Sequence, residues 1–169
     1  MAEVGPTPGD SRSVDSLRQL PLGIRLRDDA TLDNFKTRPA LAPVLAALRS
    51  QATEGEQNVL YLHGPPGSGK SHLLQGACHL AGAQALFLPL AELAPYAAQD
   101  VLQGMAGANL LCLDDLDAVL GRPDWERALF NLYNQAQQAG GGLVIAANAA
   151  PRALHLELDD LRSRLSAAV

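Results

Sequence analysis

One run of eight residues has the types and the spacing needed to bind a phosphate. Residues 64–71 read Gly-Pro-Pro-Gly-Ser-Gly-Lys-Ser, a full match to the pattern G-x-x-x-x-G-K-[ST]. The glycines let the backbone curl around a phosphate and turn several N–H groups towards it. Lys70 would place a point charge on the β- and γ-phosphates, and the hydroxyl of Ser71 is a hard oxygen ligand suited to Mg²⁺. The phosphate-binding residues predicted here are Gly64, Pro65, Pro66, Gly67, Ser68, Gly69, Lys70, Ser71 and His72.

The residues on either side of this run have the required context. Residues 58–62 are apolar and favour a β-strand, and residues 72–81 carry apolar side chains at helical spacing. The order strand, glycine-rich loop and helix brings the positive end of the helix dipole to the phosphate. A glycine-rich turn that matches by chance is the alternative, and it does not explain this context.

Two acids end a second apolar run, residues 109–115. Asp114 is in the place of an aspartate that holds Mg²⁺ opposite Ser71. In many ATPases of this type a glutamate follows and orients the attacking water, whereas this chain has Asp115, which is one methylene shorter. The alternative is that both acids simply face solvent at the end of a strand.

Asn148 follows a third apolar run, residues 143–147, at what we expect to be the carboxyl end of a strand. Its amide could hydrogen-bond the γ-phosphate or the attacking water. The alternative is that Asn148 simply begins a turn after the strand, as asparagine often does.

A basic pair lies near the C-terminal end. Arg164 is a candidate arginine finger, which reaches a nucleotide held by a neighbouring subunit and stabilises the transition state. The alternative is local: Asp160 with Arg164, and Asp159 with Arg162, have the spacing of ion pairs on a helix surface.

Strands that alternate with helices predict an α/β fold with a mainly parallel sheet between two layers of helices. Ligands of such sheets bind at the carboxyl ends of the strands, where the glycine loop, the two acids and Asn148 would meet. The expected strands are 58–62, 85–89, 109–115 and 143–147, and the expected helices are 39–51, 72–81, 91–106 with a break at Pro95, 123–139 and 156–165.

Composition narrows the class of protein. The chain has 169 residues, of which 47% are hydrophobic and 18% charged, values that suit one soluble domain with its own core. The net charge of −5 argues against a broad basic surface for nucleic acid. No apolar run has transmembrane length and the N-terminus has no apolar signal core, so we expect a cytoplasmic protein without membrane partners. Cys78 and Cys112 each lie in an apolar run, which predicts two buried free thiols.

Residues 1–18 are small, polar and proline-bearing, which predicts a disordered tail. Residues 19–24 form a short apolar island, broken by Pro21 and Gly23. On composition alone this island reads as an ordinary linker, and partner docking is the other reading. Residues 25–169 would form the nucleotide-binding domain.

Four segments together resemble the AAA+ P-loop base domain of the DnaA/Hda family. This resemblance implies a three-layer α/β/α P-loop NTPase fold that binds ADP or ATP with Mg²⁺. It also implies catalytic roles for Asp115, Asn148 and Arg164. In this family a fifth strand and a helical lid would follow after Val169, so we expect the lid domain to be missing and nucleotide binding to be weak. The four segments are Thr31–Phe35, Gly64–Leu74, Leu111–Leu116 and Leu161–Leu165.

Within the family, the chain is similar to the Hda type, which carries a clamp-binding peptide of the form Gln-Leu-x-Leu-Pro-Leu in a short tail. Gln19, Leu20 and Leu22 match that peptide, while Gly23 and Ile24 depart from it. The resemblance implies a regulator that, with the DNA polymerase sliding clamp (beta subunit), promotes hydrolysis of DnaA-bound ATP and so inhibits replication initiation. It implies weak or no ATP hydrolysis of its own, no direct sequence-specific DNA binding, and homo-oligomerisation as an option.

Two other functions remain open at this point. A helicase loader of DnaC type shares the pair of aspartates and an arginine box. A P-loop kinase of small metabolites shares the phosphate loop but would need an acceptor pocket and an arginine-bearing lid.

Overall fold

The computed structural model describes Ile24 and residues 26–169. The expected tail (1–18) and the clamp-binding residues Gln19, Leu20 and Leu22 lie outside the described residues.

Four parallel strands form one sheet in the order β1-β4-β3-β2. The strands are β1 (Val59–His63), β2 (Ala85–Pro89), β3 (Leu110–Asp114) and β4 (Gly142–Ala147). In the register, His63 pairs with Ala147 and Pro89 pairs with Asp114, so all four carboxyl ends lie along one edge. At the outer edge of β1, the N–H of Val169 donates to the oxygen of Val59 (3.0 Å) and its own oxygen accepts from Tyr61 (2.9 Å).

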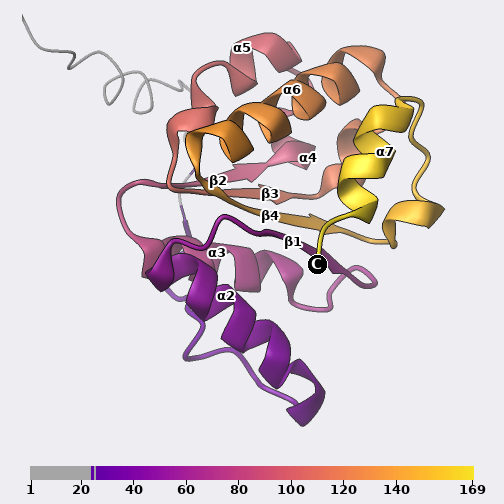
Figure 1. Ribbon diagram of the computed structural model, residues 1–169. Coiled ribbons are helices and arrows are strands. Elements are labelled where there is room, and N and C mark those ends of the chain that lie inside the picture. The colour runs from indigo at the N-terminus through magenta and orange to yellow at the C-terminus, as the bar shows by residue number, and fades with distance from the viewer. Residues whose placement is uncertain (1–23, 25) are drawn as a thin grey trace, which may run out of the picture.

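Helices cover both faces of this sheet, as Figure 1 shows. On one face lie α2 (Ala42–Glu54) and α3 (Lys70–Ala81), and on the other lie α4 (Leu90–Leu93), α5 (Ala98–Leu102), α6 (Pro123–Ala139) and α7 (Asp159–Ser166). Each face buries its own cluster of apolar side chains. The predicted three-layer α/β/α fold with a parallel sheet is therefore confirmed.

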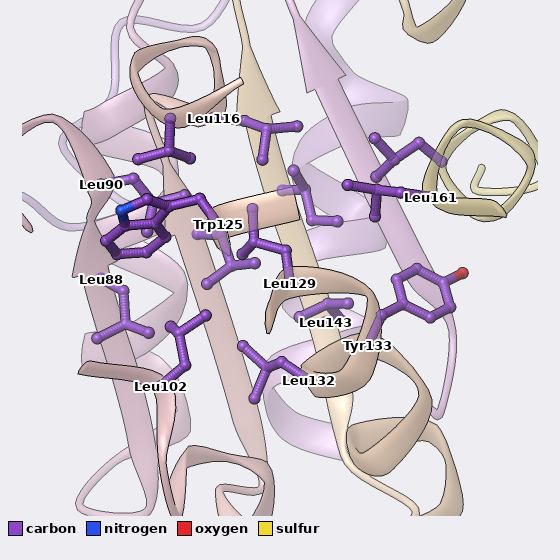
Figure 2. Close-up of a cluster of buried hydrophobic side chains, with 14 of the residues drawn as sticks. Leu88, Leu90, Leu102, Leu116, Trp125, Leu129, Leu132, Tyr133, Leu143 and Leu161 are labelled. Atoms are coloured by element: carbon purple, nitrogen blue, oxygen red, sulfur yellow. The ribbon is translucent and has the colours of Figure 1, made fainter. Parts of the chain in front are cut away.

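Helix α6 contributes Trp125, Leu129, Leu132 and Tyr133 to one core, shown in Figure 2. Its apolar side chains recur at helical spacing, and Trp125 is fully buried. Strand β3 is buried along its whole length, as expected for a central strand of a parallel sheet. The sequence predicted one apolar side of this helix, and all its members are buried: Trp125, Leu129, Leu132, Tyr133 and Ala136.

Three predicted boundaries were wrong. Helix α2 continues to Glu54, where a loop was expected, and ends at Gly55 in the left-handed region (φ 65°). The predicted break at Pro95 is present between α4 and α5, but the helical stretch ends at Leu102 and not at Ala106, because Gln103 is extended before the short 3₁₀ turn Met105–Gly107. Helix α7 begins at Asp159, three residues later than expected.

The connections between these helices and strands contain short 3₁₀ turns. They are Pro39–Leu41 (η1), Met105–Gly107 (η2), Leu116–Val119 (η3) and Pro151–Ala153 (η4). Cys78 and Cys112 are buried free thiols, as predicted. Within residues 24 and 26–169, none of the helices combines the length and the apolar character needed to cross a membrane.

Candidate functional site

The phosphate loop connects the end of β1 to the start of α3. Gly67 and Gly69 adopt φ values of 79° and 94°, which favour glycine. Lys70 is the first residue of α3, and its ammonium group donates to the backbone oxygens of Gly64 (2.6 Å) and Pro65 (2.9 Å). The charge is thus held over the loop by weak carbonyl acceptors, which phosphate oxygens can replace.

Ser71 and Asp114 face each other across the sheet edge. The hydroxyl of Ser71 donates to Oδ2 of Asp114 at 2.5 Å, and Oδ1 of Asp114 accepts the N–H of Asp115 at 3.0 Å. Asp114 is only 3% exposed. A hydroxyl and a carboxylate suit Mg²⁺, which takes few protein ligands and completes its shell with phosphate oxygens and water. The predicted pair is therefore brought together in a form that fits this ion.

Asp115 has an unusual backbone for a residue with a side chain. Its φ of 54° and ψ of 48° lie in the left-handed region, and no other described residue except glycine has a positive φ. Loss of water around the carboxyl, followed by the charges of Asp114 and Asp117, raises the pKa of Asp115, while Lys70 lowers it. Strain and crowded charge at one residue are typical of functional sites.

Asn148 is exposed at the end of β4, as predicted. Its backbone N–H donates to Oδ2 of Asp117 at 2.8 Å. This contact joins the turn after β3 to the end of β4, so that Asp117 positions Asn148. Asp117 was missed by the sequence analysis, and the signal was its place as the third acid in Asp-Asp-Leu-Asp.

The segment before η1 packs along the phosphate-loop helix. Nε2 of His72 donates to the backbone oxygen of Thr31 (2.7 Å) and to Oδ1 of Asn34 (2.9 Å). The ring of Phe35 meets the His72 ring edge-on, with 5.4 Å between centroids. A Cβ at Gly69 would lie 2.7 Å from the Phe35 ring. His72, predicted to help bind the cofactor, is thus placed against the segment 31–35, a contact that the sequence analysis did not predict.

The two arginines of α7 have different surroundings. The guanidinium of Arg162 is half-buried and donates to the backbone oxygens of Leu154 (3.3 Å) and Leu156 (2.8 Å). Arg164 is exposed, and in the part of the chain that the structure describes its side chain has no hydrogen bond or ion pair. Its backbone oxygen accepts from the hydroxyl of Tyr133 at 3.4 Å.

The local ion pairs considered for these arginines do not form. The salt bridges among residues 24 and 26–169 are Arg27–Asp29, Arg49–Asp33 and Arg122–Asp124. Neither Asp159 nor Asp160 pairs with an arginine of α7. The exposed side chain of Arg164 is therefore available to another molecule.

This fold and this loop define a P-loop nucleotide-binding domain. The family AAA, "ATPase family associated with various cellular activities", matches residues 60–167. The chain belongs to this family, and membership in a family of ATPases supports nucleotide binding.

Particular relatives share the fold. The chain is 39% identical over 153 residues to an uncharacterised protein of Haemophilus influenzae, and the match covers 88% of this chain and 65% of that protein. The replication initiator DnaA bound to AMPPCP and single-stranded DNA superposes with a TM-score of 0.77 at 23% identity, covering 86% of this chain and 50% of DnaA. Domain III of DnaA from Thermotoga maritima has a TM-score of 0.73 at 24% identity, covering 86% and 67%. The DnaI structure has a TM-score of 0.61 at 19% identity, covering 85% and 80%.

At these identities the likeness to DnaA and DnaI is one of fold. The chain spans 65% of the length of the Haemophilus protein and half of the DnaA chain bound to AMPPCP.

Proposed function

We propose that this chain is an AAA+ regulator of DNA replication initiation of the Hda type. It binds ADP or ATP, docks on the sliding clamp, and promotes hydrolysis of the ATP bound to DnaA. The observation that carries the proposal is the exposed Arg164 on a domain whose own site holds the phosphate loop and the Ser71–Asp114 pair. Such a function belongs in the cytoplasm.

The residues of the chain's own site would bind a nucleotide but hydrolyse it slowly. The loop N–H groups and Lys70 bind phosphate oxygens, and Ser71 and Asp114 would hold Mg²⁺, which neutralises phosphate charge. Asp115 is shorter than the glutamate that commonly orients water. We therefore propose weak or no intrinsic hydrolysis, with Asp115 and Asn148 in contact with the water or the γ-phosphate.

Arg164 would act in trans. The exposed guanidinium of Arg164 on α7 can approach the γ-phosphate of ATP held by DnaA and stabilise charge as the bond breaks. An arginine supplied in this way is worth on the order of 10³-fold or more in rate. Arg162 is excluded from this role in the proposal because its guanidinium already binds two backbone oxygens.

Docking on the clamp would use Gln19, Leu20 and Leu22, which match the peptide of Hda-type tails. The test is clamp binding by surface plasmon resonance for the parent chain and for the double variant Gln19→Ala, Leu20→Ala. The variant should lose clamp binding and keep its melting temperature. Undiminished binding would return residues 19–24 to the status of a linker.

A pull-down separates this proposal from the two alternatives. The chain is mixed with clamp, DnaA and replicative helicase, with and without nucleotide. We expect capture of clamp and DnaA. Capture of helicase without clamp would favour the helicase loader, and phosphorylation of a small acceptor would favour a kinase.

A further inference from the structure

One carboxylate on α6 is fully enclosed and yet belongs to none of the nucleotide-site residues. Glu126 is 1% exposed. Its Oε1 accepts the N–H of Gly121 (3.0 Å), and its Oε2 accepts the N–H of Leu158 (2.9 Å). The N–H of Glu157 lies 3.2 Å from Oε1 and 3.1 Å from Oε2. Burying a carboxylate is costly unless its oxygens are hydrogen-bonded, and here three backbone donors satisfy them.

The three donors come from two connectors that lead away from the nucleotide site. Gly121 lies near the end of the connector between β3 and α6, the same connector in which Asp115 and Asp117 lie. Glu157 and Leu158 end the connector between β4 and α7, which begins at Asn148. Glu126 therefore joins the ends of these connectors, while the Asp117–Asn148 contact joins them near the site.

Leu158 is also the residue that precedes the first turn of α7. The start of α7 is thus bound to α6 through Glu126. Further along α6, on the same face, the hydroxyl of Tyr133 donates to the backbone oxygen of Arg164 (3.4 Å). Leu161 and Leu165 are the buried side chains of α7. Figure 2 draws Tyr133 of α6 and Leu161 of α7 among the side chains of the same buried cluster. Tyr133 follows Glu126 by seven residues, two helical turns, so one side of α6 supports α7 at both ends.

We infer that Glu126 is a positioning residue for the trans-acting arginine: it fixes α7, and through it Arg164, relative to the connector that carries Asp115. This inference rests on the proposed function of Arg164. A hydrophobic residue in place of Glu126 would fill the same space but would remove the acceptor of three backbone N–H groups. Glutamine keeps the shape, yet its NH₂ group turns a donor towards those same N–H groups.

The first experiment needs no partner. Amide hydrogen exchange is compared between the parent and Glu126→Gln. The amides of Glu157, Leu158 and the first turn of α7 should exchange at least tenfold faster, and those of β3 and β4 should be unchanged. Unchanged exchange at Glu157 and Leu158 would overturn the inference.

A matched control lies next to the site. The side chain of Glu157 is exposed and only its backbone N–H reaches Glu126, so Glu157→Gln removes the same charge without removing an acceptor. Its exchange pattern and its activity should equal those of the parent. A change in Glu157→Gln as large as that in Glu126→Gln would also overturn the inference.

The second experiment measures stimulation of DnaA ATP hydrolysis with clamp loaded on DNA. Glu126→Gln should lower the maximal stimulation at least tenfold, while the concentration for half-maximal stimulation stays within twofold. Glu126→Asp, which keeps the charge but is one methylene shorter, should recover part of the stimulation, and it carries the test if the glutamine variant does not fold. Full stimulation together with faster exchange would overturn the link between Glu126 and Arg164.

The variant Arg164→Ala in the same assay distinguishes a failure of the proposed function from a failure of the inference about Glu126. If it retains stimulation, the proposed function fails, and the exchange experiment alone decides whether Glu126 fixes α7. If Arg164→Ala loses stimulation and Glu126→Gln does not, only the inference about Glu126 fails.

Discussion

The hydroxyl of Ser71 donates to the carboxylate of Asp114 at 2.5 Å, joining the first turn of α3 to the end of β3 although the residues are 43 positions apart in the chain. Both groups are good ligands for Mg²⁺, and a bound ion would replace the hydrogen bond between them. Removing the hydroxyl of Ser71 should therefore weaken the binding of ADP mainly when Mg²⁺ is present.

Mg²⁺ enhances ADP affinity by the ratio of the affinity with Mg²⁺ to the affinity without it. For Ser71→Ala we expect this ratio to fall to nearly one. The measurement is titration calorimetry in Mg²⁺ and in EDTA. Ser163→Ala, on the exposed surface of α7, is the control and should keep the enhancement. An unchanged enhancement in Ser71→Ala would exclude this residue as an Mg²⁺ ligand.

Lys70→Ala tests the charge over the phosphate loop. The ammonium group is bound only to neutral oxygens of Gly64, Pro65 and Ser68, so it is free to transfer to phosphate. A charged hydrogen bond contributes about 1.5–3 kcal/mol, which is roughly a 10- to 150-fold loss of ADP affinity in the variant. Lys36→Ala, an exposed lysine outside the loop, should bind as the parent does. Equal affinities for parent and Lys70→Ala would argue against nucleotide phosphate at this loop.

The packing of the segment 31–35 on α3 depends on a glycine. A Cβ on Gly76 would lie 2.8 Å from the backbone nitrogen of Leu32 and 3.0 Å from the carbonyl carbon of Thr31. A clash with backbone atoms at these distances lies at the upper end of the ~1–3 kcal/mol that overpacking costs. Alanine offsets about 1 kcal/mol of this cost through its better helix propensity, so the free energy of unfolding of Gly76→Ala should fall by about 1–2 kcal/mol.

Urea unfolding measures this change. Gly107→Ala is the matched control, because a Cβ there meets no atom within 4 Å and the residue needs no positive φ. It should alter the free energy of unfolding by less than about 0.5 kcal/mol. A Gly76→Ala variant as stable as the parent would mean that the segment is not held closely against α3.

Much of the fold was predictable because it depends on short-range patterns. The apolar run Ala85–Pro89 has the bounds of β2, and the periodic apolar residues of α6 face the core. The phosphate loop was predictable for the same reason, since its residues are contiguous. In residues 91–106 the predicted break at Pro95 is present, but the predicted end at Ala106 was wrong, because the alanine, leucine and glutamine content favours a longer helix whereas Gly104 takes φ 76° and breaks it.

The contacts that were missed are long-range and involve backbone groups. Asp117 binds the N–H of Asn148, and Glu126 binds the N–H groups of Glu157 and Leu158, in each case 31 or 32 positions away. An acid in the first turn of a helix is ordinarily read as a favourable charge at its N-terminus, so nothing in the spacing distinguished Glu126.

Asp115 predicts a pH dependence of stability. The pKa of Asp115 is raised in the folded chain, so the folded state holds this proton more tightly than the unfolded state. Its favourable contribution is present at low pH and is lost as pH rises through the folded pKa, above the ordinary value of 3.8. Asp115→Asn cannot ionise, and asparagine tolerates positive φ. The variant should therefore gain stability over the parent as pH rises from about 3 to about 7.

Chemical unfolding at a series of pH values checks this sign. Asp28→Asn is the control, because Asp28 is exposed and has no partner among the described residues, and it should show no comparable gain. A gain for Asp115→Asn that shrinks with rising pH would show that the sign is wrong.

The two arginines of α7 should separate stability from function. Arg162→Ala removes a half-buried guanidinium that donates to Leu154 and Leu156, so the free energy of unfolding should fall by about 1–2 kcal/mol. Arg164→Ala removes an exposed side chain without such contacts, so the change should be below about 0.5 kcal/mol.

The activities should follow the opposite order. In a reconstituted assay with DnaA and clamp on DNA, Arg164→Ala should keep ADP binding and clamp binding but lose stimulation of ATP hydrolysis, on the order of 10³-fold if its guanidinium alone stabilises the transition state. Arg162→Ala should retain most stimulation at temperatures where it is folded. Arg164→Lys would keep a positive charge but not the planar fork of donors, so it should recover only a small part of the rate. Full stimulation by Arg164→Ala, with the loss appearing in Arg162→Ala instead, would contradict the proposal. The role would then belong to Arg162, and Arg164 would be an ordinary surface residue.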